Sequence, residues 1–350
     1  MDQVQQTYNI GIVGCGNISD THAQAISKTE KGNLIAAFSR TESTVEEFGL
    51  QYDIKSYTSY KKFLGDPALD IVAICTPTGT HLEYGLQAAE AGKYLIIEKP
   101  IEITVERGQT LIKTCKKNEV ELAVIYQNRF IPEVIEMKKH MEAQTIGAPL
   151  MAHASVKWYR DQEYYNNSSW RGTFALDGGG AVINQSIHTV DLLQWVAGKV
   201  ESITAFKGTF THDGMEAEDN AVACLKFKNG ALGVFQASTS ITPPQEREIE
   251  INGTKGTLLL KGNVLHKQLS DHGESDVPSK TENAAGASSP LSGMTHQNHK
   301  SQYNAILDSF YNNTTPMVSG KESLHSLAIV EALYQAGTEQ KVIQIEDIFS

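Results

Sequence analysis

The sequence predicts an α/β protein with two domains: a doubly wound parallel sheet, then an α/β domain with a large, open and mainly antiparallel sheet. Two observations support this fold class. In the first third of the chain, short apolar runs alternate with helical segments, as the crossover units of a parallel sheet require. In the second half, strand-like runs follow one another with short turns between them, as in antiparallel hairpins.

Length and charge limit the domain count and the partners. At 350 residues the chain is long for one domain, so we expect two, 1–126 and 127–350. Hydrophobic residues make up 40% of the chain, enough for a substantial core. The formal net charge of -11 disfavours nucleic acids and anionic membranes as partners, because it would repel their phosphates.

Neither the N-terminus nor the cysteines indicate export. The first seven residues are polar and lack the pattern of a signal peptide, and no apolar run approaches the roughly 20 residues that span a bilayer. The four cysteines are scattered, with no spacing typical of zinc or redox motifs. We therefore expect a cytoplasmic protein without a bound metal.

Five apolar runs in the first third are expected to form buried parallel strands, with helices between them. The expected strands are Tyr8–Val13, Asn33–Phe38, Asp70–Cys75, Tyr94–Ile97 and Leu122–Tyr126. The expected helices are Asp20–Thr29, His81–Ala91 and Thr104–Asn118. Gly92 follows the second of these helices, as a C-terminal glycine commonly does.

The second half begins with a helix near Pro132–Met141 and then changes to hairpins. Asn229-Gly230 is a strong type I′ turn signal, and a second turn covers Asn252–Gly256. Residues 270–293 are rich in Ser, Gly, Asp and Ala without a period, which indicates a long loop, either a lid or plain surface disorder. The expected strands are Ala221–Phe227, Ala231–Ser238, Glu248–Ile251 and Thr257–Leu260, and the later helices are Gln302–Tyr311 and Glu322–Gln335.

The first strand leads directly into a glycine-rich turn typical of dinucleotide binding. Gly14 permits the tight turn, and Gly16 lets the backbone approach a pyrophosphate at the start of the next helix. Asn17 and Ile18 continue the turn. Ser19 stands where the third glycine of the fingerprint would be, and it could serve as an N-cap. We therefore expect NAD or NADP as the cofactor.

The end of the second strand favours NADP over NAD. Phe38 is followed by Ser39 and Arg40, with no Asp or Glu to bond the ribose 2′-hydroxyl of NAD. A hydroxyl and a guanidinium suit a 2′-phosphate better, because arginine binds phosphate as a bidentate fork. The alternative is a solvated Arg40 in a protein that binds NAD through other contacts.

Two further segments, together with the glycine turn, resemble one protein family. The first is Glu98-Lys99-Pro100, which follows the loop at residues 76–81, and the second is the run GGGAVINQSIHTVD at residues 178–191. In this order the motifs closely resemble the Gfo/Idh/MocA family, which includes glucose–fructose oxidoreductase and inositol dehydrogenases. The resemblance extends over nearly the whole chain. It implies a Rossmann cofactor domain, a substrate domain and a homodimer or homotetramer.

The family pattern also implies roles for particular residues. Lys99 would be catalytic at the nicotinamide, and His188 would act as an acid/base or orient the substrate. The chemistry agrees, because oxidation of a secondary alcohol needs a base for the hydroxyl proton while hydride leaves the same carbon. The further residues expected at the cofactor are Thr76, Pro77, His81 and Glu98.

On a regular helix, Asn184, His188 and Asp191 fall at i, i+4 and i+7 and share a face that could hold the hydroxyls of a sugar. Many sugar dehydrogenases of the family carry Asp where this chain has Asn184. Asparagine can bond hydroxyls but cannot take up a proton at neutral pH, so Lys99 and His188 must suffice for proton transfer. Asp191 is interpreted as structural.

The aromatic and arginine residues between Trp158 and Arg171, together with Arg129, are interpreted as sugar-binding. Aromatic faces stack on the apolar faces of pyranose rings, and arginines bond hydroxyls or carboxylates. The alternative is that several of these residues only pack the domain interface. With Asn184, the candidate substrate residues are Arg129, Tyr159, Trp170 and Arg171.

Three functions fit the resemblance. The first is an oxidoreductase that moves a hydride between the cofactor and a secondary alcohol or ketone of a sugar, an inositol or a sugar derivative. The second is a redox-neutral glycosidase that oxidises its sugar transiently with bound NAD. The third is a sensor that binds the dinucleotide without catalysis. Lys99 and His188 count against the sensor, and Ser39-Arg40, which suits exchangeable NADP, counts against the glycosidase, so we expect the oxidoreductase.

Overall fold

The computed structural model describes residues 7–270, 272–276 and 296–350, which form two units. The first unit contains residues 7–102, 106–127 and 296–324, and the second contains 103–105, 128–270, 272–276 and 325–350. The chain therefore leaves the first unit near the predicted boundary. The assignment of all of 127–350 to the second domain is wrong, because residues 296–324 return to the first unit.

The first unit is built on a sheet of six parallel strands in the order β3-β2-β1-β4-β5-β6. The chain winds outward in one direction from β1 to β3 and in the other from β4 to β6, so the switch point lies between β1 and β4. This confirms the predicted Rossmann sheet, although the sequence did not indicate the short β3. The strands are β1 (Tyr8–Val13), β2 (Gly32–Phe38), β3 (Lys55–Tyr57), β4 (Ile71–Ile74), β5 (Tyr94–Ile97) and β6 (Leu122–Val124).

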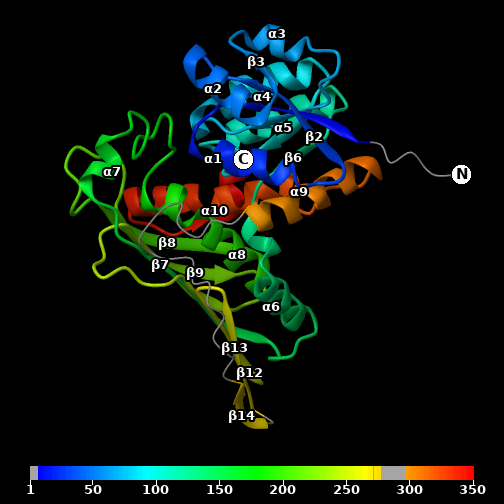
Figure 1. Ribbon diagram of the computed structural model, residues 1–350. Helices are drawn as coiled ribbons and strands as arrows, with labels where there is room; N and C mark the ends of the chain where they lie inside the picture. Colours follow the sequence, from blue (N-terminus) through cyan, green and yellow to red (C-terminus); the bar gives the residue numbers. More distant parts are fainter. Residues whose placement is uncertain (1–6, 271, 277–295) are drawn as a thin grey trace, which may run out of the picture. The chain divides into compact units, whose positions relative to one another are not determined.

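Helix α9 (His296–Tyr311) completes the core of the first unit although it lies far along the chain. Its buried residues Tyr303, Ile306, Leu307 and Phe310 follow the i, i+3, i+4, i+7 spacing of one helix face. They pack in one cluster with β1 and with α1, beside which α9 is drawn in orange in Figure 1. The other helices of this unit are α1 (Asn17–Ile26), α2 (Glu42–Tyr52), α3 (Tyr60–Leu64), η1 (Thr78–Thr80), α4 (His81–Glu90) and α5 (Val105–Lys117).

Within the described residues, the second unit contains a nine-stranded sheet in the order β14-β13-β12-β11-β7-β10-β9-β8-β15. Its neighbouring strands are antiparallel except β7 and β10, which run parallel. The predicted mainly antiparallel sheet is thereby confirmed. The strands are β7 (Pro149–Lys157), β8 (Val200–Gly208), β9 (Asn220–Phe227), β10 (Leu232–Ser238), β11 (Glu248–Gly253), β12 (Gly256–Lys261), β13 (Val264–Leu269), β14 (His272–Asp276) and β15 (Ile343–Gln344).

Strand β14 lies inside the segment that the sequence predicts as a loop, 270–293. Its residues pair antiparallel with β13, so the loop prediction is wrong for 272–276. Polar and small residues without a period still pair here, because the neighbouring strand offers a free edge. Residue 271 and residues 277–293 lie outside the described residues.

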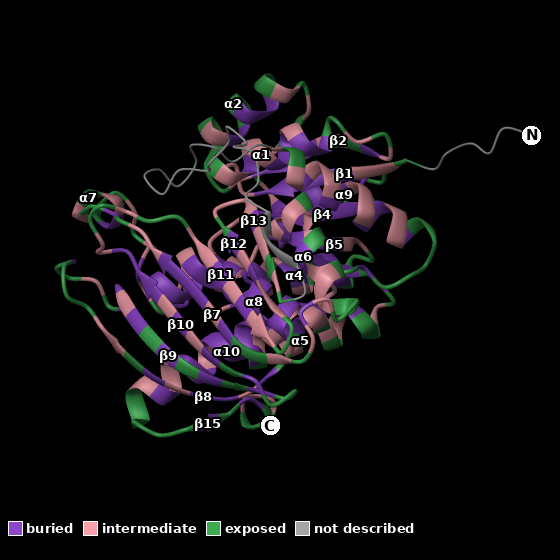
Figure 2. Cartoon of the chain, turned by 90° about the horizontal axis from the view of Figure 1, so that it is seen from below, coloured by how far each residue is buried: buried purple, intermediate pink, exposed green. Residues whose placement is uncertain are grey.

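One face of the second sheet is covered and the other is exposed. Helix α8 (Ile187–Ala197) packs against β7, and the π-helical turn η3 (Ala181–Ser186) packs against β9 and β10. Buried and exposed residues alternate along β9, as Figure 2 shows, which is typical of a strand with one covered face. The remaining helices are η2 (Gln127–Phe130), α6 (Pro132–Glu142), α7 (Gln162–Asn166), α10 (Gly320–Glu339) and η4 (Ile345–Phe349). In the described part of the chain, no helix has the length and apolar character to cross a membrane.

A buried ion pair joins three segments of the second unit. The Arg129 guanidinium donates from Nε and Nη2 to the two carboxylate oxygens of Asp191 on α8, at 2.7 and 2.6 Å. Ser326 on α10 donates to the same carboxylate at 2.7 Å. Arg129 is only 1% exposed, so it is a structural residue, in place of the substrate-binding residue that the sequence indicated. Asp191 has the structural role expected of it.

Asp191→Leu should destabilise the protein by about 3–5 kcal/mol, because it leaves the Arg129 guanidinium buried without this carboxylate. The change is measured as a shift of the urea-unfolding midpoint. As a control, Glu201→Gln removes the exposed ion pair between Glu201 and Lys226 and should cost less than about 1 kcal/mol. Equal losses in the two variants would show that the buried pair contributes no more than a surface pair.

Candidate cofactor and active site

The turn between β1 and α1 has the geometry that a dinucleotide site needs. Gly14 has a φ of +91°, and a Cβ there would lie 2.9 Å from the Thr76 methyl group and 3.0 Å from the Cys75 carbonyl. Gly16 is exposed, and a Cβ there would meet no atom within 4 Å. The turn is therefore tight on its inner side and open at Gly16, where α1 begins with unpaired N–H groups that attract an anion.

Ser19 does not cap α1 as predicted. The helix begins at Asn17, with Gly16 in the N-cap position and Ile18 in the first turn. Ser19 is fully buried, and its hydroxyl donates to the carbonyl of Gly16. Its small size therefore serves close packing, as the third glycine of the fingerprint does.

The residues after β2 carry no carboxylate. Phe38 is buried, whereas Arg40 is exposed. The hydroxyl oxygen of Ser39 accepts a hydrogen bond from the N–H of Thr41 at 3.2 Å, which orders the turn. A solvent-facing guanidinium thus stands at the carboxyl end of β2, the strand next to the glycine turn.

The loop after β4 is held by His81. The side chain is fully buried, with Nε2 2.9 Å from the carbonyl oxygen of Thr76 and Nδ1 3.0 Å from that of Pro100. Thr80 donates to the Thr76 hydroxyl at 2.8 Å. His81 therefore joins the loops after β4 and β5 and supports them, in place of the predicted direct contact with the cofactor. For Thr76 and Pro77 that contact stays a prediction.

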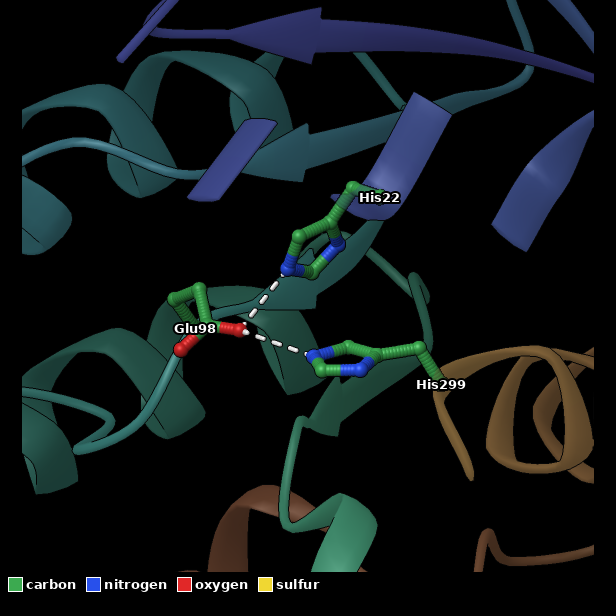
Figure 3. Close-up of side chains that lie close together, drawn as sticks. All are labelled: His22, Glu98 and His299. Atoms are coloured by element: carbon green, nitrogen blue, oxygen red, sulfur yellow. Dashed lines mark hydrogen bonds and ion pairs between the residues drawn. The ribbon is translucent and has the colours of Figure 1, made fainter. Parts of the chain in front are cut away.

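The Glu98 carboxylate at the end of β5 is buried and bonded through both oxygens. Oε1 accepts from Nε2 of His22 on α1 at 2.7 Å, and Oε2 accepts from the backbone N–H of Lys99 at 3.0 Å. The other ring nitrogen of His22 lies 2.8 Å from the Tyr303 hydroxyl on α9. Figure 3 shows His22 and His299 approaching the same oxygen of Glu98, with His299 Nε2 3.9 Å away. The Glu98 side chain thus holds the backbone that carries Lys99.

His22 and Glu98 form a charged pair. Burial opposes the charge on Glu98, but the hydrogen bond and the charge of His22 lower its pKa to about 2. Burial also opposes the charge on His22, but its neighbours Cys75, Tyr303 and Glu98 raise its pKa well above the ordinary value. Burial lowers the pKa of His299 to about 3, so this ring is neutral. One nitrogen or oxygen atom from each of the three side chains in Figure 3 lies within 4.8 Å of the other two, a spacing that could also hold a metal ion. The direct hydrogen bond between His22 and Glu98 explains the closest of these contacts without a metal ion.

The glycine run at 178–180 allows close packing in the second unit. Gly178 and Gly179 have φ values of +83° and +151°, which disfavour larger residues. A Cβ on Gly179 would overlap the Tyr334 hydroxyl, and one on Gly180 would overlap the Glu218 carbonyl. These overlaps show that the glycine run serves close packing.

Asn184 and His188 do not lie on one regular helix. Asn184 belongs to the π-helical turn η3, and α8 begins only at Ile187. The predicted i, i+4, i+7 face is therefore wrong, because a π turn contains more residues than an α turn. Both side chains remain partly exposed. Turns of this type often mark functional sites.

Two buried carboxylates that the sequence analysis missed hold this turn. Asp177 accepts a hydrogen bond from the Asn184 amide at 2.6 Å. Glu218 accepts from the Val182 N–H at 2.8 Å and from the Tyr334 hydroxyl at 3.1 Å. Burial raises the pKa of Glu218 to about 7. The position of Asp177 directly before the glycine run is the one sequence signal that could have identified it.

The predicted sugar-binding stretch forms one cluster with η3. Gln185, next to Asn184, accepts from Arg160 Nη2 at 2.9 Å and donates to the Tyr164 hydroxyl at 2.8 Å. The Arg171 guanidinium lies over the Tyr164 ring, 4.2 Å from its centre. Hydrogen bonds and ring contacts therefore connect the aromatic stretch to Asn184.

Two further candidates adjoin this cluster. The Arg171 guanidinium lies 5.4 Å from the centre of the Trp170 ring. Tyr159 is 45% exposed, and its carbonyl accepts from Arg160 Nη1 at 2.8 Å. The structure thus groups four of the five predicted substrate residues, and their role in substrate binding stays a prediction.

Comparison with known proteins relates both units to one family. Residues 8–126 match a family model for an oxidoreductase family with an NAD-binding Rossmann fold, and residues 134–259 match the GFO/IDH/MocA C-terminal domain. The uncharacterized oxidoreductase YrbE of Bacillus subtilis is 30% identical over 252 residues, 71% of this chain and 72% of its own length. Myo-inositol 2-dehydrogenase of Thermotoga maritima is 25% identical over 353 residues, 97% of this chain and 99% of its own.

Solved structures agree with this relation. The WlbA dehydrogenase from Bordetella pertussis, in complex with NADH and UDP-GlcNAcA, has a TM-score of 0.87 at 29% identity and covers 98% of this chain and 99% of its own. A levoglucosan dehydrogenase in complex with NADH and L-sorbose has a TM-score of 0.88, and the match covers 98% of this chain and 100% of that chain. At 18% identity this likeness concerns the fold alone. Both domain models and the YrbE match agree: the chain belongs to the Gfo/Idh/MocA family of oxidoreductases, which bind NAD through a Rossmann fold.

Proposed function

We propose that the protein moves a hydride between a bound nicotinamide dinucleotide and a secondary alcohol carbon of a sugar, an inositol or a sugar derivative, with Lys99 exchanging the hydroxyl proton. The position of Lys99 carries this proposal. It follows β5, and β1, β4 and β5 are consecutive strands of a parallel sheet, so they end at one edge. The open glycine turn follows β1 at the same edge, and ligands of doubly wound sheets bind there.

The chain's own part in the reaction is to bind the substrate and to move one proton. When bound, the nicotinamide supplies the carbon that accepts or gives the hydride. Lys99 takes up the hydroxyl proton during oxidation and returns it during reduction. His188 acts as a second acid/base or orients the reacting hydroxyl, and Asn184 bonds neighbouring hydroxyls.

Two observations support a sugar-like substrate. Relatives over most of the chain are named myo-inositol 2-dehydrogenase and levoglucosan dehydrogenase. The second unit also presents partly exposed aromatic rings, Tyr159 and Trp170, in the cluster that contains Asn184. Such rings stack on the apolar faces of sugars.

Lys99→Met should lower kcat by about 100-fold or more, because a positioned acid/base contributes roughly 10²–10⁴-fold. The substrate is first found by a nicotinamide absorbance screen of sugars, inositols and keto-sugars with NAD and NADP. NADH affinity, measured by fluorescence titration, should stay near that of the wild type.

The matched control is Lys62→Met, which changes an exposed lysine on α3 and should keep full activity. Substantial turnover by Lys99→Met would contradict the role of Lys99. Release of free sugar without a change in nicotinamide absorbance would indicate the glycosidase instead.

The cofactor proposed for this chain is NADP, with NAD bound more weakly. Arg40 is exposed directly after β2, and neither Ser39 nor Arg40 would repel a 2′-phosphate. A guanidinium bonds a phosphate through charge-assisted hydrogen bonds, which are stronger than bonds to a neutral hydroxyl. The NADH in the WlbA structure belongs to that protein.

Wild-type protein should bind NADPH about 10- to 100-fold more tightly than NADH, as expected for a charge-assisted hydrogen bond of about 1.5–3 kcal/mol. Arg40→Asp should reverse this preference, because a carboxylate repels the phosphate and bonds the ribose hydroxyl. Arg40→Lys keeps the charge and serves as the control. Tighter binding of NADH by the wild type would refute the proposal.

The exposed face of the second sheet is proposed as an interface between copies of this chain. Phe206 on β8 is 66% exposed and lies opposite Val222 on β9, and Leu232 on β10 is 57% exposed and lies opposite Met151 on β7. Paired residues point to the same side of a sheet, and β7, β10, β9 and β8 are consecutive strands. Apolar surface of this kind typically marks a protein–protein interface.

Phe206→Glu should convert a homodimer or homotetramer into smaller species, because it places a charge inside the apolar interface. Size-exclusion chromatography with light scattering measures the mass. Leu50→Glu is the control, since Leu50 is 85% exposed but lies on α2 of the first unit. A monomeric wild type, or a Phe206→Glu variant of unchanged mass, would rule out this interface.

A further inference from the structure

Arg160 is a buried cation without a carboxylate partner among the described residues. It is 5% exposed, and its two Nη atoms donate to uncharged acceptors, the Tyr159 carbonyl and the Gln185 side chain. Its Nε is buried and has no hydrogen-bond partner in the described part of the chain. Buried charges in proteins are normally paired, so this arrangement needs an explanation.

Arg171 lies in the same cluster and leaves one edge of its guanidinium unused. Nη1 donates to the Tyr164 carbonyl at 3.0 Å, while Nε is buried without a partner in the residues that the structure describes. The Nε–Nη2 edge is the one by which Arg129 binds Asp191 elsewhere in this unit. Tyr164 lies against the face of the Arg171 guanidinium, so the edge is what remains for a ligand.

The acidic residues of this region are engaged elsewhere. Asp161 caps α7 by accepting from the Tyr164 N–H at 2.8 Å, and Asp177 accepts from the Asn184 amide. Burial lowers the pKa of Arg160, and the neighbouring cation of Arg171 acts in the same direction. Neither of the two positive charges of the cluster therefore has an ion-pair partner among the described residues.

The two arginines belong to the same cluster as Asn184, a proposed substrate residue. Gln185 accepts from Arg160 and donates to Asn184, at 2.9 and 3.0 Å, so an anion at the arginines and a hydroxyl at Asn184 can belong to one small ligand. A guanidinium edge donates two parallel hydrogen bonds to the planar fork of a carboxylate, whose single negative charge balances that of one arginine.

We propose that the substrate is a sugar acid and that Arg171, supported by Arg160, binds its carboxylate. This inference rests on the proposed oxidoreductase function and defines its substrate class more narrowly.

Arg247 is a further arginine with an unbonded Nε among the described residues, and it serves as the comparison. Its Nε also lacks a partner among the described residues, yet it donates to the Gly262 carbonyl and to Asn263 next to β11, without aromatic rings or a second arginine.

The experiment compares matched pairs that differ in the carboxylate: D-glucose with D-glucuronate, D-galactose with D-galacturonate, and UDP-glucose with UDP-glucuronate. Glucose 6-phosphate carries a phosphate in place of the carboxylate. Binding to the full chain is measured by calorimetry with saturating NADPH or NADH, and turnover by nicotinamide absorbance. In at least one pair the wild type should favour the acid by about 10-fold or more, the effect of one charge-assisted contact.

The variants assign this preference to the arginine. Arg171→Gln should bring the ratio of the affinities for the acid and for the neutral sugar close to one. Arg171→Lys keeps the charge but not the planar fork, so it should give an intermediate ratio. Arg160→Gln should also reduce the ratio, and the control Arg247→Gln should leave it at the wild-type value. Thermal unfolding checks that each variant is folded. If Arg171→Gln does not fold, the comparison of Arg171→Lys with the wild type still tests the proposal.

The outcomes separate this inference from the proposed function. If a neutral sugar is turned over as well as its acid, or the phosphate is preferred, the oxidoreductase stands and the sugar-acid proposal is overturned. If an acid binds preferentially and Arg171→Gln removes the preference, but no compound is oxidised or reduced, the binding inference stands and the proposed function fails. No preference for the acid in any pair overturns the inference.

Discussion

The buried carboxylate of Glu98 is the constraint on which the first unit depends. It is bonded to His22 on α1 and to the backbone of Lys99, and His22 contacts Tyr303 on α9. The helix that follows the cofactor turn, the loop that carries the proposed catalytic lysine and a helix from far along the chain thus meet at one ionised pair. Removing a partner from such a pair leaves a buried charge, which costs about 3–5 kcal/mol, so the three segments are held as one arrangement.

This constraint explains why the cofactor unit is not continuous in sequence. A sheet ending at β6 would leave His22 without its Tyr303 contact and would expose the apolar surface of β1 and α1 that α9 covers. The apolar face of α9 spans Tyr303 to Phe310, about two turns, and it buries its rings in that core. The return of the chain is therefore part of the packing of the first unit, and it also places the Tyr303 hydroxyl against His22, the partner of Glu98.

The sequence predicts the elements whose signal is local and misses those that depend on distant partners. Continuous apolar runs such as β4 and β5 identify buried parallel strands by themselves, and Gly14 identifies the tight turn because few other residues adopt its φ. Neither the unit to which α9 belongs nor the π-helical turn at Asn184 can be deduced locally. The first depends on which core has space for its apolar face. The second depends on hydrogen bonds that the turn donates to the carboxylates of Asp177 and Glu218, residues 7 and 34 positions from Asn184.

The arginines show the same limit in the candidate site. Arg129 and Arg171 have the same chemistry, and motif reasoning assigned both to the substrate. In the structure the Nε–Nη2 edge of Arg129 is filled by Asp191, whereas among the described residues Arg171 contacts only the Tyr164 carbonyl and two aromatic rings. What separates a structural arginine from a binding one is thus whether a carboxylate of the chain reaches it, which is a property of the tertiary fold. A buried guanidinium that the fold has not paired is stabilised by an anion from outside, and this makes charge balance a better guide to substrate class than residue type.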